Sequence, residues 1–142
     1  MALFPTLEYH PDLETDGWRV ENGEALNAQH PTTFWIPDEA SRQDLHPGDY
    51  AKLVFEIRTG NAKIPIVGER MWVLVRERAD GGYLGVLHDQ PSMAANKEFG
   101  WGYELPFSPR HVIQIETRTK KTIALARVEP KWRWLRQGRP AA

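Results

Sequence analysis

The stretch ERMWVLVRERADGGYLGVLHD (69–89) decides the fold of this chain. Apolar side chains occupy both faces of its first part, residues 69–78, where Met71 and Val73 oppose Trp72. Strands that are covered on both faces have nearly continuous apolar runs, whereas half-exposed strands alternate. The pattern therefore predicts a long strand in the middle of a sheet.

A tight turn follows this strand. Asp80, Gly81 and Gly82 separate it from a second apolar segment, YLGVLHD (83–89). Because glycine adopts positive φ at little cost, these residues favour a hairpin turn. Gly85, inside the returning strand, predicts a bulge or a close approach of another part of the backbone.

The segment YAKLVFEIR (50–58) predicts a second, half-buried strand. Its apolar and polar side chains alternate with a period of two, and HPGDY (46–50) supplies the preceding turn. The residues expected to face the core are Ala51, Leu53, Phe55 and Ile57.

The rest of the chain contains shorter elements. Residues 92–100 predict a short helix with Ser92 as its N-cap and a glycine as its stop. Residues 101–116 predict two short strands on either side of a turn, and residues 122–128 fit either a helix or a strand. The residues before Pro37 show little periodicity, so we expect irregular wrapping structure with one or two short elements.

Together these patterns predict a mainly β fold of the α+β class. We expect a small curved antiparallel sheet or partly open barrel, with one or two short helices. The length fits a single domain, 1–142. Within it, residues 1–40 are expected to form a wrapping N-terminal segment and residues 117–142 a basic C-terminal extension.

The composition is typical of a soluble globular protein, with 41% apolar and 26% charged residues. No apolar run approaches the roughly 20 residues that cross a bilayer, and the first residues lack the features of a secretory signal. The absence of cysteine excludes disulfides, thiolate nucleophiles and cysteine-based zinc sites. We therefore expect a cytoplasmic protein that does not enter a membrane.

Charge is distributed unevenly, although the net charge is only −1. Residues 1–49 carry ten acids against Arg19 and Arg42, a net charge of −8, and residues 117–142 carry eight bases against Glu129, a net charge of +7. Such asymmetry can mark an interaction segment. Alternatively, the two ends neutralise each other within the fold, because opposite charges attract at short range.

The sequence contains no nucleophile elbow, phosphate-binding loop or dinucleotide-binding motif. The five histidines have no metal-site spacing. A metal could still assemble on His88 and Asp89, and Glu69, Asp89 and Glu104 could form a carboxylate pair. Structural roles account for these residues more simply. We therefore predict no enzymatic activity, no catalytic residue, no metal and no cofactor.

The C-terminal KWRWLRQGRP (131–140) alternates aromatic and basic side chains. In an extended backbone the two indoles share one face and the bases the other, an arrangement that could stack single-stranded bases or clamp phosphates. An amphipathic closing strand with its bases in solvent is the explanation we favour, because the whole-chain pI is only about 6.5. The alternative nucleic-acid site consists of Lys131, Trp132, Arg133, Trp134 and Arg136.

Six tryptophans are a high number for this length. Most of them must fill the core of so small a sheet, but one or two exposed indoles beside the acidic N-terminal segment would anchor a partner. The residues predicted to bind that partner are Asp12, Glu14, Asp16, Trp18, Glu21, Glu24 and Trp35.

Six segments within residues 16–115 share one pattern: DGW (16–18), NAQHPTTFWIP (27–37), RQDLHPGDYAKLVFE (42–56), ERMWVLV (69–75), YLGVLHDQP (83–91) and FSPRHVIQI (107–115). With these segments the chain resembles a bacterial family of unknown function that has the pattern ERMWV…YxGxLxxxP…HI. His88 stands where that pattern leads us to expect asparagine, and the basic tail after Thr117 lies outside the pattern.

Relatives of that family include immunity proteins of polymorphic toxin systems. The resemblance thus implies a protein that binds and blocks a bacterial toxin, and it transfers no catalytic residue. The −8 segment would suit a basic toxin surface, since opposite charge speeds capture. We expect a protein partner, in particular a cognate toxin. A nucleic acid is the less favoured partner, and a homodimer is also compatible with the sequence.

Overall fold

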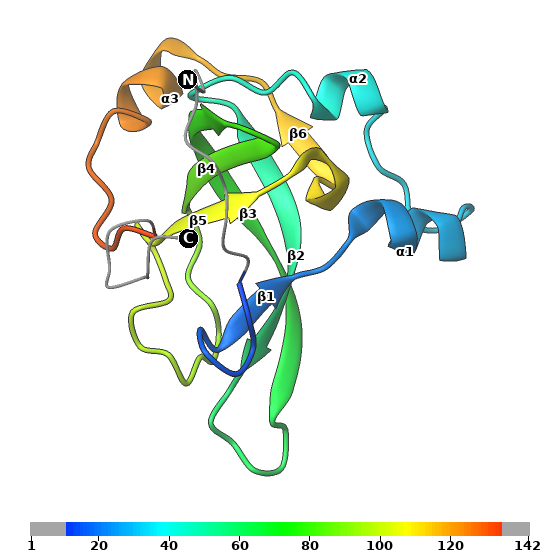
Figure 1. Cartoon of the computed structure of the whole chain (residues 1–142), viewed down its shortest axis with the longest axis vertical. Helices are drawn as coiled ribbons and strands as arrows, with labels where there is room; N and C mark the ends of the chain where they lie inside the picture. The colour runs from blue at the N-terminus through cyan, green and yellow to red at the C-terminus, as the bar shows by residue number, and fades with distance from the viewer. Residues whose placement is uncertain (1–10, 135–142) are drawn as a thin grey trace.

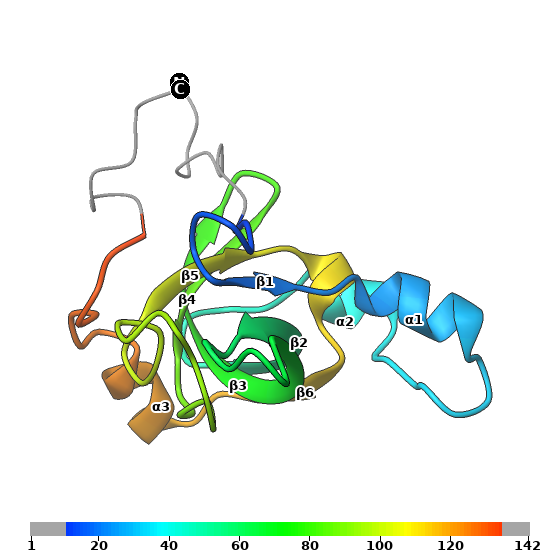
Figure 2. The ribbon, with the colours of Figure 1, turned by 90° about the horizontal axis from the view of Figure 1, so that it is seen from below.

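The computed structural model describes residues 11–134. Its framework is a six-stranded antiparallel sheet in the order β1-β2-β3-β4-β5, with β6 also pairing with β2. The sheet curls into a half-barrel (Figures 1 and 2). This confirms the predicted mainly β class and curved sheet. The strands are β1 (Trp18–Val20), β2 (Tyr50–Arg58), β3 (Ile66–Ala79), β4 (Gly82–Leu87), β5 (Glu104–Phe107) and β6 (Gln114–Glu116).

The two strands predicted from 50–58 and 69–78 form the middle of the sheet. β2 has the predicted bounds and alternates buried with half-buried residues along its whole length. β3 begins earlier than predicted and pairs with β2 from Ile66 opposite Arg58 to Leu74 opposite Tyr50. Apolar residues on the inner faces of these strands enter the core.

The hairpin between β3 and β4 is also confirmed. Gly81 has a φ of 83°, a left-handed conformation that favours glycine. Gly85 meets both expectations: the β3–β4 register shifts opposite it, between Val75 and Glu77, and a Cβ on Gly85 would lie 2.6 Å from Cγ1 of Val73. Only a residue without a side chain fits this approach.

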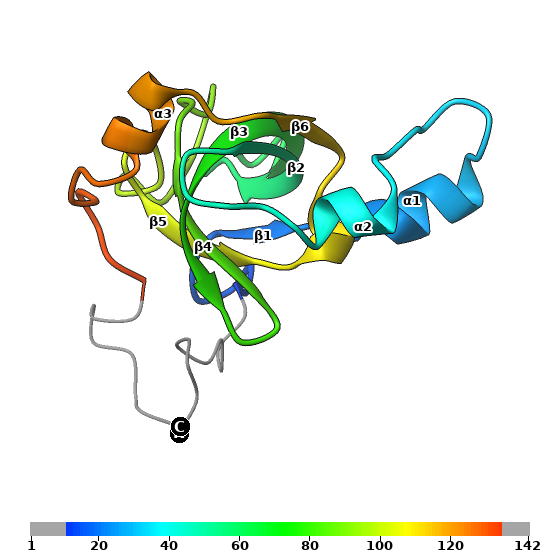
Figure 3. The same ribbon diagram turned by 90° about the horizontal axis from the view of Figure 1, so that it is seen from above.

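Three short helices flank the sheet, which is one more than the predicted upper number. Asn22 caps α1 by accepting a hydrogen bond from the backbone N–H of Ala25. In Figure 3, α1 and α2 lie together on one side of the sheet and α3 lies on the opposite side. The helices are α1 (Gly23–Gln29), α2 (Glu39–Arg42) and α3 (Lys120–Leu125), and a single 3₁₀ turn covers Pro109–His111.

The predicted helix at residues 92–100 is wrong. This segment is irregular because its polar groups bond to distant parts of the chain instead of to one another. The N–H of Ala95 donates to the carbonyl of Arg58 at 2.8 Å, and Asn96 Nδ2 donates to the carbonyl of Asp16 at 2.8 Å. Phe99, at 1% exposure, packs in the core. Tertiary bonding thus overrides a weak local helix signal.

An aromatic cluster fills the inside of the half-barrel. Trp18 stacks on Phe99 with 4.8 Å between ring centroids and donates its indole N–H to the hydroxyl of Tyr103 at 3.2 Å. Trp134 meets Trp18 edge-on at 5.7 Å. Such aromatic pairs contribute about 0.5–1.5 kcal/mol each beyond the burial of their area. The first and the last parts of the described chain, which carry Trp18 and Trp134, therefore pack into the same core.

None of the helices described within residues 11–134 is long and apolar enough to cross a bilayer.

Candidate partner-binding groove

An open groove of about 890 Å³ lies between the loop that follows α1 and the strand β6. Trp35 and Pro37 line one wall, Ile113 and Ile115 line the other, and the buried Leu45 also contributes. The walls come from distant parts of the sequence. They meet because β6 pairs with the first residues of β2, directly after the segment that carries Leu45.

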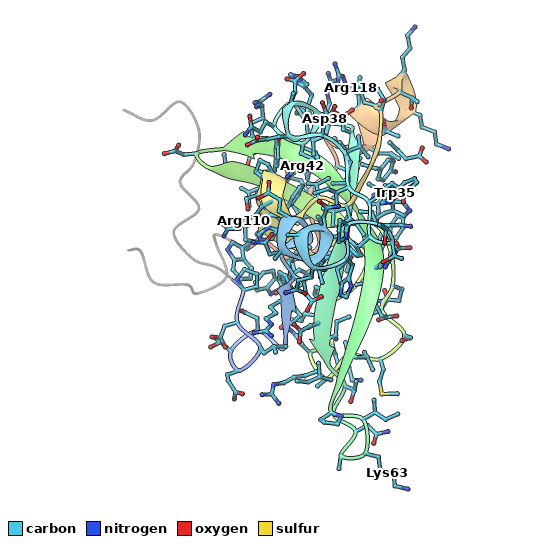
Figure 4. All side chains as sticks on the ribbon, turned by 90° about the vertical axis from the view of Figure 1, so that its right-hand side faces the viewer. Trp35, Asp38, Arg42, Lys63, Arg110 and Arg118 are labelled. Carbon is cyan, nitrogen blue, oxygen red and sulfur yellow. The ribbon has the colours of Figure 1, made fainter. Side chains whose placement is uncertain are left out.

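Trp35 is the most exposed large apolar side chain among the described residues, at 78%. Figure 4 shows it toward the right-hand edge of the molecule, with Asp38 and Arg118 above it. Its indole N–H donates to the carbonyl of Thr32 at 3.2 Å. The side chain therefore faces solvent in a fixed orientation and lies ready for a contact.

The loop that carries Trp35 is fastened on both sides. Asn27 Nδ2 in α1 donates to the carbonyl of Phe34 at 2.7 Å. The Phe34 ring lies 5.2 Å from the guanidinium carbon of Arg70 on β3, within the range of a cation–π contact. These contacts hold the neighbour of Trp35 against the sheet and leave Trp35 itself outside.

Arg42 holds the helical side of the groove together. It is only 5% exposed, and it donates to the carbonyl of Pro37 at 2.8 Å and to the carbonyl of Pro109 at 3.0 Å. Its guanidinium also pairs with Glu24 at 2.6 Å. A buried arginine needs such partners because an unpaired buried charge is costly. One side chain therefore joins α1, α2 and the turn before β6.

Asp49 fixes the opposite side of the groove. Asp49 is only 3% exposed. Its carboxylate accepts hydrogen bonds from the backbone N–H groups of Arg118, at 2.7 Å, and His46, at 2.8 Å. The Arg118 guanidinium lies 3.3 Å from the same carboxylate. Within residues 11–134, this is the one ion pair that joins the acidic N-terminal block to the basic C-terminal block.

The rim of the groove is acidic. The Asp44 side chain, 75% exposed, lines the groove and lies 3.1 Å from the imidazole of His46 and 3.7 Å from Arg78. Asp38, at the start of α2, is exposed next to the groove residue Pro37. Glu39 faces a separate hollow that Gln43 and Arg78 also line. An exposed indole with an acidic rim suits a partner surface that combines apolar and basic side chains.

The structure divides the residues predicted to bind a partner. Trp18 is fully buried in the aromatic core and Asp16 is 7% exposed, so the prediction that these two contact a partner is wrong. Their burial follows from the pairing of β1 with β2, which turns Trp18 inward opposite Ile57. Trp35 is the one predicted indole anchor that is exposed.

The remaining predicted acids do not gather around Trp35. Asp12 accepts backbone hydrogen bonds within its own turn. Glu14 pairs with Arg58, and Glu24 pairs with Arg42. Burial, together with a hydrogen bond to Glu56, raises the pKa of Glu21 above its usual range.

The C-terminal segment closes the core. Trp134 is fully buried, and the Trp132 ring stacks on Tyr103 with 4.3 Å between centroids. Lys131 is exposed, whereas Arg133 pairs with Glu129. The two indoles pack on the core as the closing explanation predicts, with Trp134 fully buried and Trp132 half-buried, but the segment forms a single bridge with Tyr103 and not a strand. Arg136, the last residue of the predicted nucleic-acid site, lies outside the described residues.

The polar residues around β3 and β4 have separate structural contacts. His88 Nδ1 lies 3.0 Å from the Tyr50 hydroxyl, and the carboxylate of Asp89 accepts the backbone N–H of Trp72 at 2.8 Å. Glu69 accepts the backbone N–H of Ser92. No group of three or more potential metal ligands occurs within the described part of the chain.

Glu104 has a buried carboxylate. Burial raises its pKa, although the backbone N–H of Trp134 donates to it at 3.0 Å and Arg76 lies 3.6 Å away. The bond to Trp134 ties the C-terminal segment to β5. Glu104 therefore has a structural role, since it holds this segment over the core.

Sequence reasoning missed Asp44, Arg118 and the isoleucines as parts of one site. In the sequence, Asp44 stands out only as one member of the acidic block, because nothing local shows that residues 35–49 and 113–118 are neighbours. The HPGD turn before β2 was the available signal, since Asp49 in that turn makes the contact with Arg118.

Comparisons of the chain with family models, with curated proteins and with solved structures found no match.

Proposed function

We propose that this chain is a non-catalytic protein-binding module whose partner docks on Trp35 and the groove behind it. The observation that carries the proposal is the 78% exposure of an indole held in one orientation by its neighbours. Tryptophan is enriched among the residues that dominate binding energy. A fixed side chain also loses little conformational freedom on binding.

The acidic rim indicates the chemistry of the partner. Asp38 and Asp44 lie at the groove and would face a basic surface. Such charge pairs speed the encounter more than they raise the affinity. The indole and the isoleucines of the groove would then supply the apolar contact that slows dissociation.

We further propose that the partner is a bacterial toxin and that this chain neutralises it in the cytoplasm. The support is the resemblance of residues 16–115 to the family with the ERMWV pattern. A rigid scaffold, a charged rim and an aromatic anchor are the features that such an inhibitor requires. Blocking a basic substrate-binding surface would account for the acidic rim.

The experiment is an affinity capture with tagged protein from a lysate of a bacterium that encodes the chain. The Trp35→Ala variant tests the site, and Trp101→Ala is the matched control because Trp101 is an exposed indole outside the groove, at 49%. Quantitative mass spectrometry should find a protein enriched by the wild type and by Trp101→Ala but lost with Trp35→Ala. Equal capture by all three proteins would contradict the proposal.

Two further measurements complete the test. Growth arrest by the captured protein should be relieved by co-expression of the wild-type chain and less so by Trp35→Ala. The nucleic-acid alternative requires a labelled single-stranded oligonucleotide to bind with a steep salt dependence. We place this alternative second because Trp134 is fully buried and the half-buried Trp132 stacks on Tyr103.

A further inference from the structure

The β2–β3 hairpin extends beyond the end of β4. Strand β4 pairs with β3 only from Val73, opposite Leu87, onward to Ala79. The first half of β3 has β2 on one side and no strand on the other among the described residues. Figure 1 shows this hairpin projecting from the lower end of the half-barrel, and Figure 4 shows Lys63 at its tip.

The backbone direction along β3 follows from hydrogen bonds at its two ends. Two residues of this stretch bond toward β2. The Pro65 carbonyl accepts the N–H of Thr59 at 3.1 Å, and the N–H of Val75 donates to the Asp49 carbonyl at 2.9 Å. Trp72 bonds away from β2: its carbonyl accepts the N–H of His88 at 2.9 Å and its N–H donates to Asp89. In an antiparallel strand the backbone N–H and C=O groups of successive residues point to opposite sides. The N–H and C=O groups of the even-numbered residues of β3 therefore point away from β2.

Ile66, Gly68 and Arg70 therefore present their N–H and C=O groups at an open edge. No backbone partner for these groups is found among residues 11–134. Gly68 is exposed, and because it has no side chain this exposure belongs to its peptide groups. Ile66 is 41% exposed. Such an edge is a template for an added strand.

We propose that this open edge of β3 binds an extended segment of a protein partner by strand addition, and that the segment alternates acidic and apolar residues. Residues 66, 68 and 70 of β3 lie on the outer face of the sheet, where Arg70 supplies positive charge at the edge itself. Glu56, opposite Gly68 on the same face, is paired with Arg19, whereas Arg70 takes part in no ion pair within residues 11–134. An acidic side chain of the added strand would pair with Arg70.

The inner face of the same edge carries Val67 and Glu69, and the Glu69 carboxylate accepts the backbone N–H of Ser92. Val67 is half-buried and packs against the core. A small apolar side chain of the added strand would lie next to it, because side chains of neighbouring strands alternate faces together. A second copy of this chain fits less well. Pairing two copies through so short an edge would bury far less surface than the roughly 1,200 Å² of a stable protein–protein interface.

Proline at Gly68 tests the edge directly. The N–H of Gly68 points away from β2, so Gly68→Pro removes a donor from the open edge and leaves the β2–β3 bonds in place. Gly68→Ala is the matched control: it keeps the N–H, and its Cβ would meet only the Phe55 carbonyl at 3.8 Å. Thermal melting and amide spectra establish that both variants fold.

The probe is a short peptide of alternating glutamate and valine, titrated into nitrogen-labelled full-length protein. Amide resonances of Ile66, Gly68 and Arg70 should shift with the wild type and with Gly68→Ala. Affinity should fall by about tenfold or more with Gly68→Pro, and likewise when lysine replaces glutamate in the peptide. Trp35→Ala should leave the titration unchanged, which separates this edge from the groove.

Three results would overturn the proposal. Binding that is equal in Gly68→Pro and Gly68→Ala would remove the edge from the interaction. Equal binding of the lysine peptide would remove the charge preference. Concentration-dependent shifts of the same amides without peptide would show that the edge pairs with a second copy of the chain instead.

Discussion

At the scale of single residues, His88 offers the clearest electrostatic test. Its imidazole lies against Tyr50 and stacks on Trp101 with 4.1 Å between ring centroids. Burial lowers the pKa of His88 below its ordinary value of 6.5, although the charge of Asp89 opposes the shift. The folded state therefore favours the neutral ring.

This shift predicts a pH dependence of stability. A histidine with a lowered pKa contributes its full stability above the pKa of the unfolded chain and loses it as pH falls below about 6.5. The free energy of unfolding should decrease between about pH 7.5 and 5.5, and His88→Asn should reduce that slope. Urea denaturation across this range measures the slope.

His30 provides the control, because it is exposed and lies on the loop after α1. The variant His30→Asn should keep the wild-type slope. A slope that is unchanged in His88→Asn would contradict the role assigned to the half-buried imidazole. Absolute stabilities are not compared, since His88→Asn also removes the contact with Tyr50.

The residue scale also shows where sequence reasoning stops. Trp18 and Trp35 both stand near acids in the sequence, and nothing local separates them. Trp18 is in the core because β1 pairs with β2, whereas Trp35 lies on a loop held by Phe34 and Arg42. Burial of an aromatic residue is decided by its tertiary neighbours.

At the scale of elements, the hairpin of β3 and β4 was predictable because its signals are local. Alternation defines the strands, and paired glycines define the turn. The irregular segment 92–100 was not predictable, because its bonds to Arg58 and Asp16 join positions far apart in the sequence. The groove was hidden for the same reason, since β6 returns to β2 from a distant part of the chain.

Gly85 tests the packing of the hairpin. A Cβ there would lie 2.6 Å from Cγ1 of Val73 and 2.7 Å from the Leu74 carbonyl oxygen, and the backbone cannot yield without disturbing the sheet. Gly85→Ala should lower the free energy of unfolding by about 1–3 kcal/mol. Gly68→Ala, made in the same sheet at an open position, should change it by less than about 1 kcal/mol. Equal losses in urea denaturation would contradict the close approach.

At the scale of the whole molecule, charge is divided between structural pairs and a free rim. Asp49, Glu14 and Glu24 are used in ion pairs that hold segments together, whereas Asp38 stays exposed beside the groove. Within residues 11–134, the two charged blocks pair with each other at Asp49 and Arg118. That the acidic block also marks an interaction segment stays a prediction.

The exposed rim predicts salt-dependent association. The rate of binding to the partner should fall on the order of tenfold between low and high ionic strength, because screening removes long-range attraction. Asp38→Asn combined with Asp44→Asn should flatten this dependence with little effect on the dissociation rate. Stopped-flow kinetics measures both rates. An association rate that ignores ionic strength would remove electrostatic steering from the account.

The central claim is that the exterior of this half-barrel recognises a protein through Trp35. Its most direct test is calorimetric titration of the captured partner with the wild type, with Trp35→Ala and with Trp101→Ala. We predict a loss of about 2 kcal/mol for Trp35→Ala, roughly a 30-fold weaker affinity, and wild-type affinity for Trp101→Ala. Unchanged affinity in Trp35→Ala, with the fold intact, would contradict the claim.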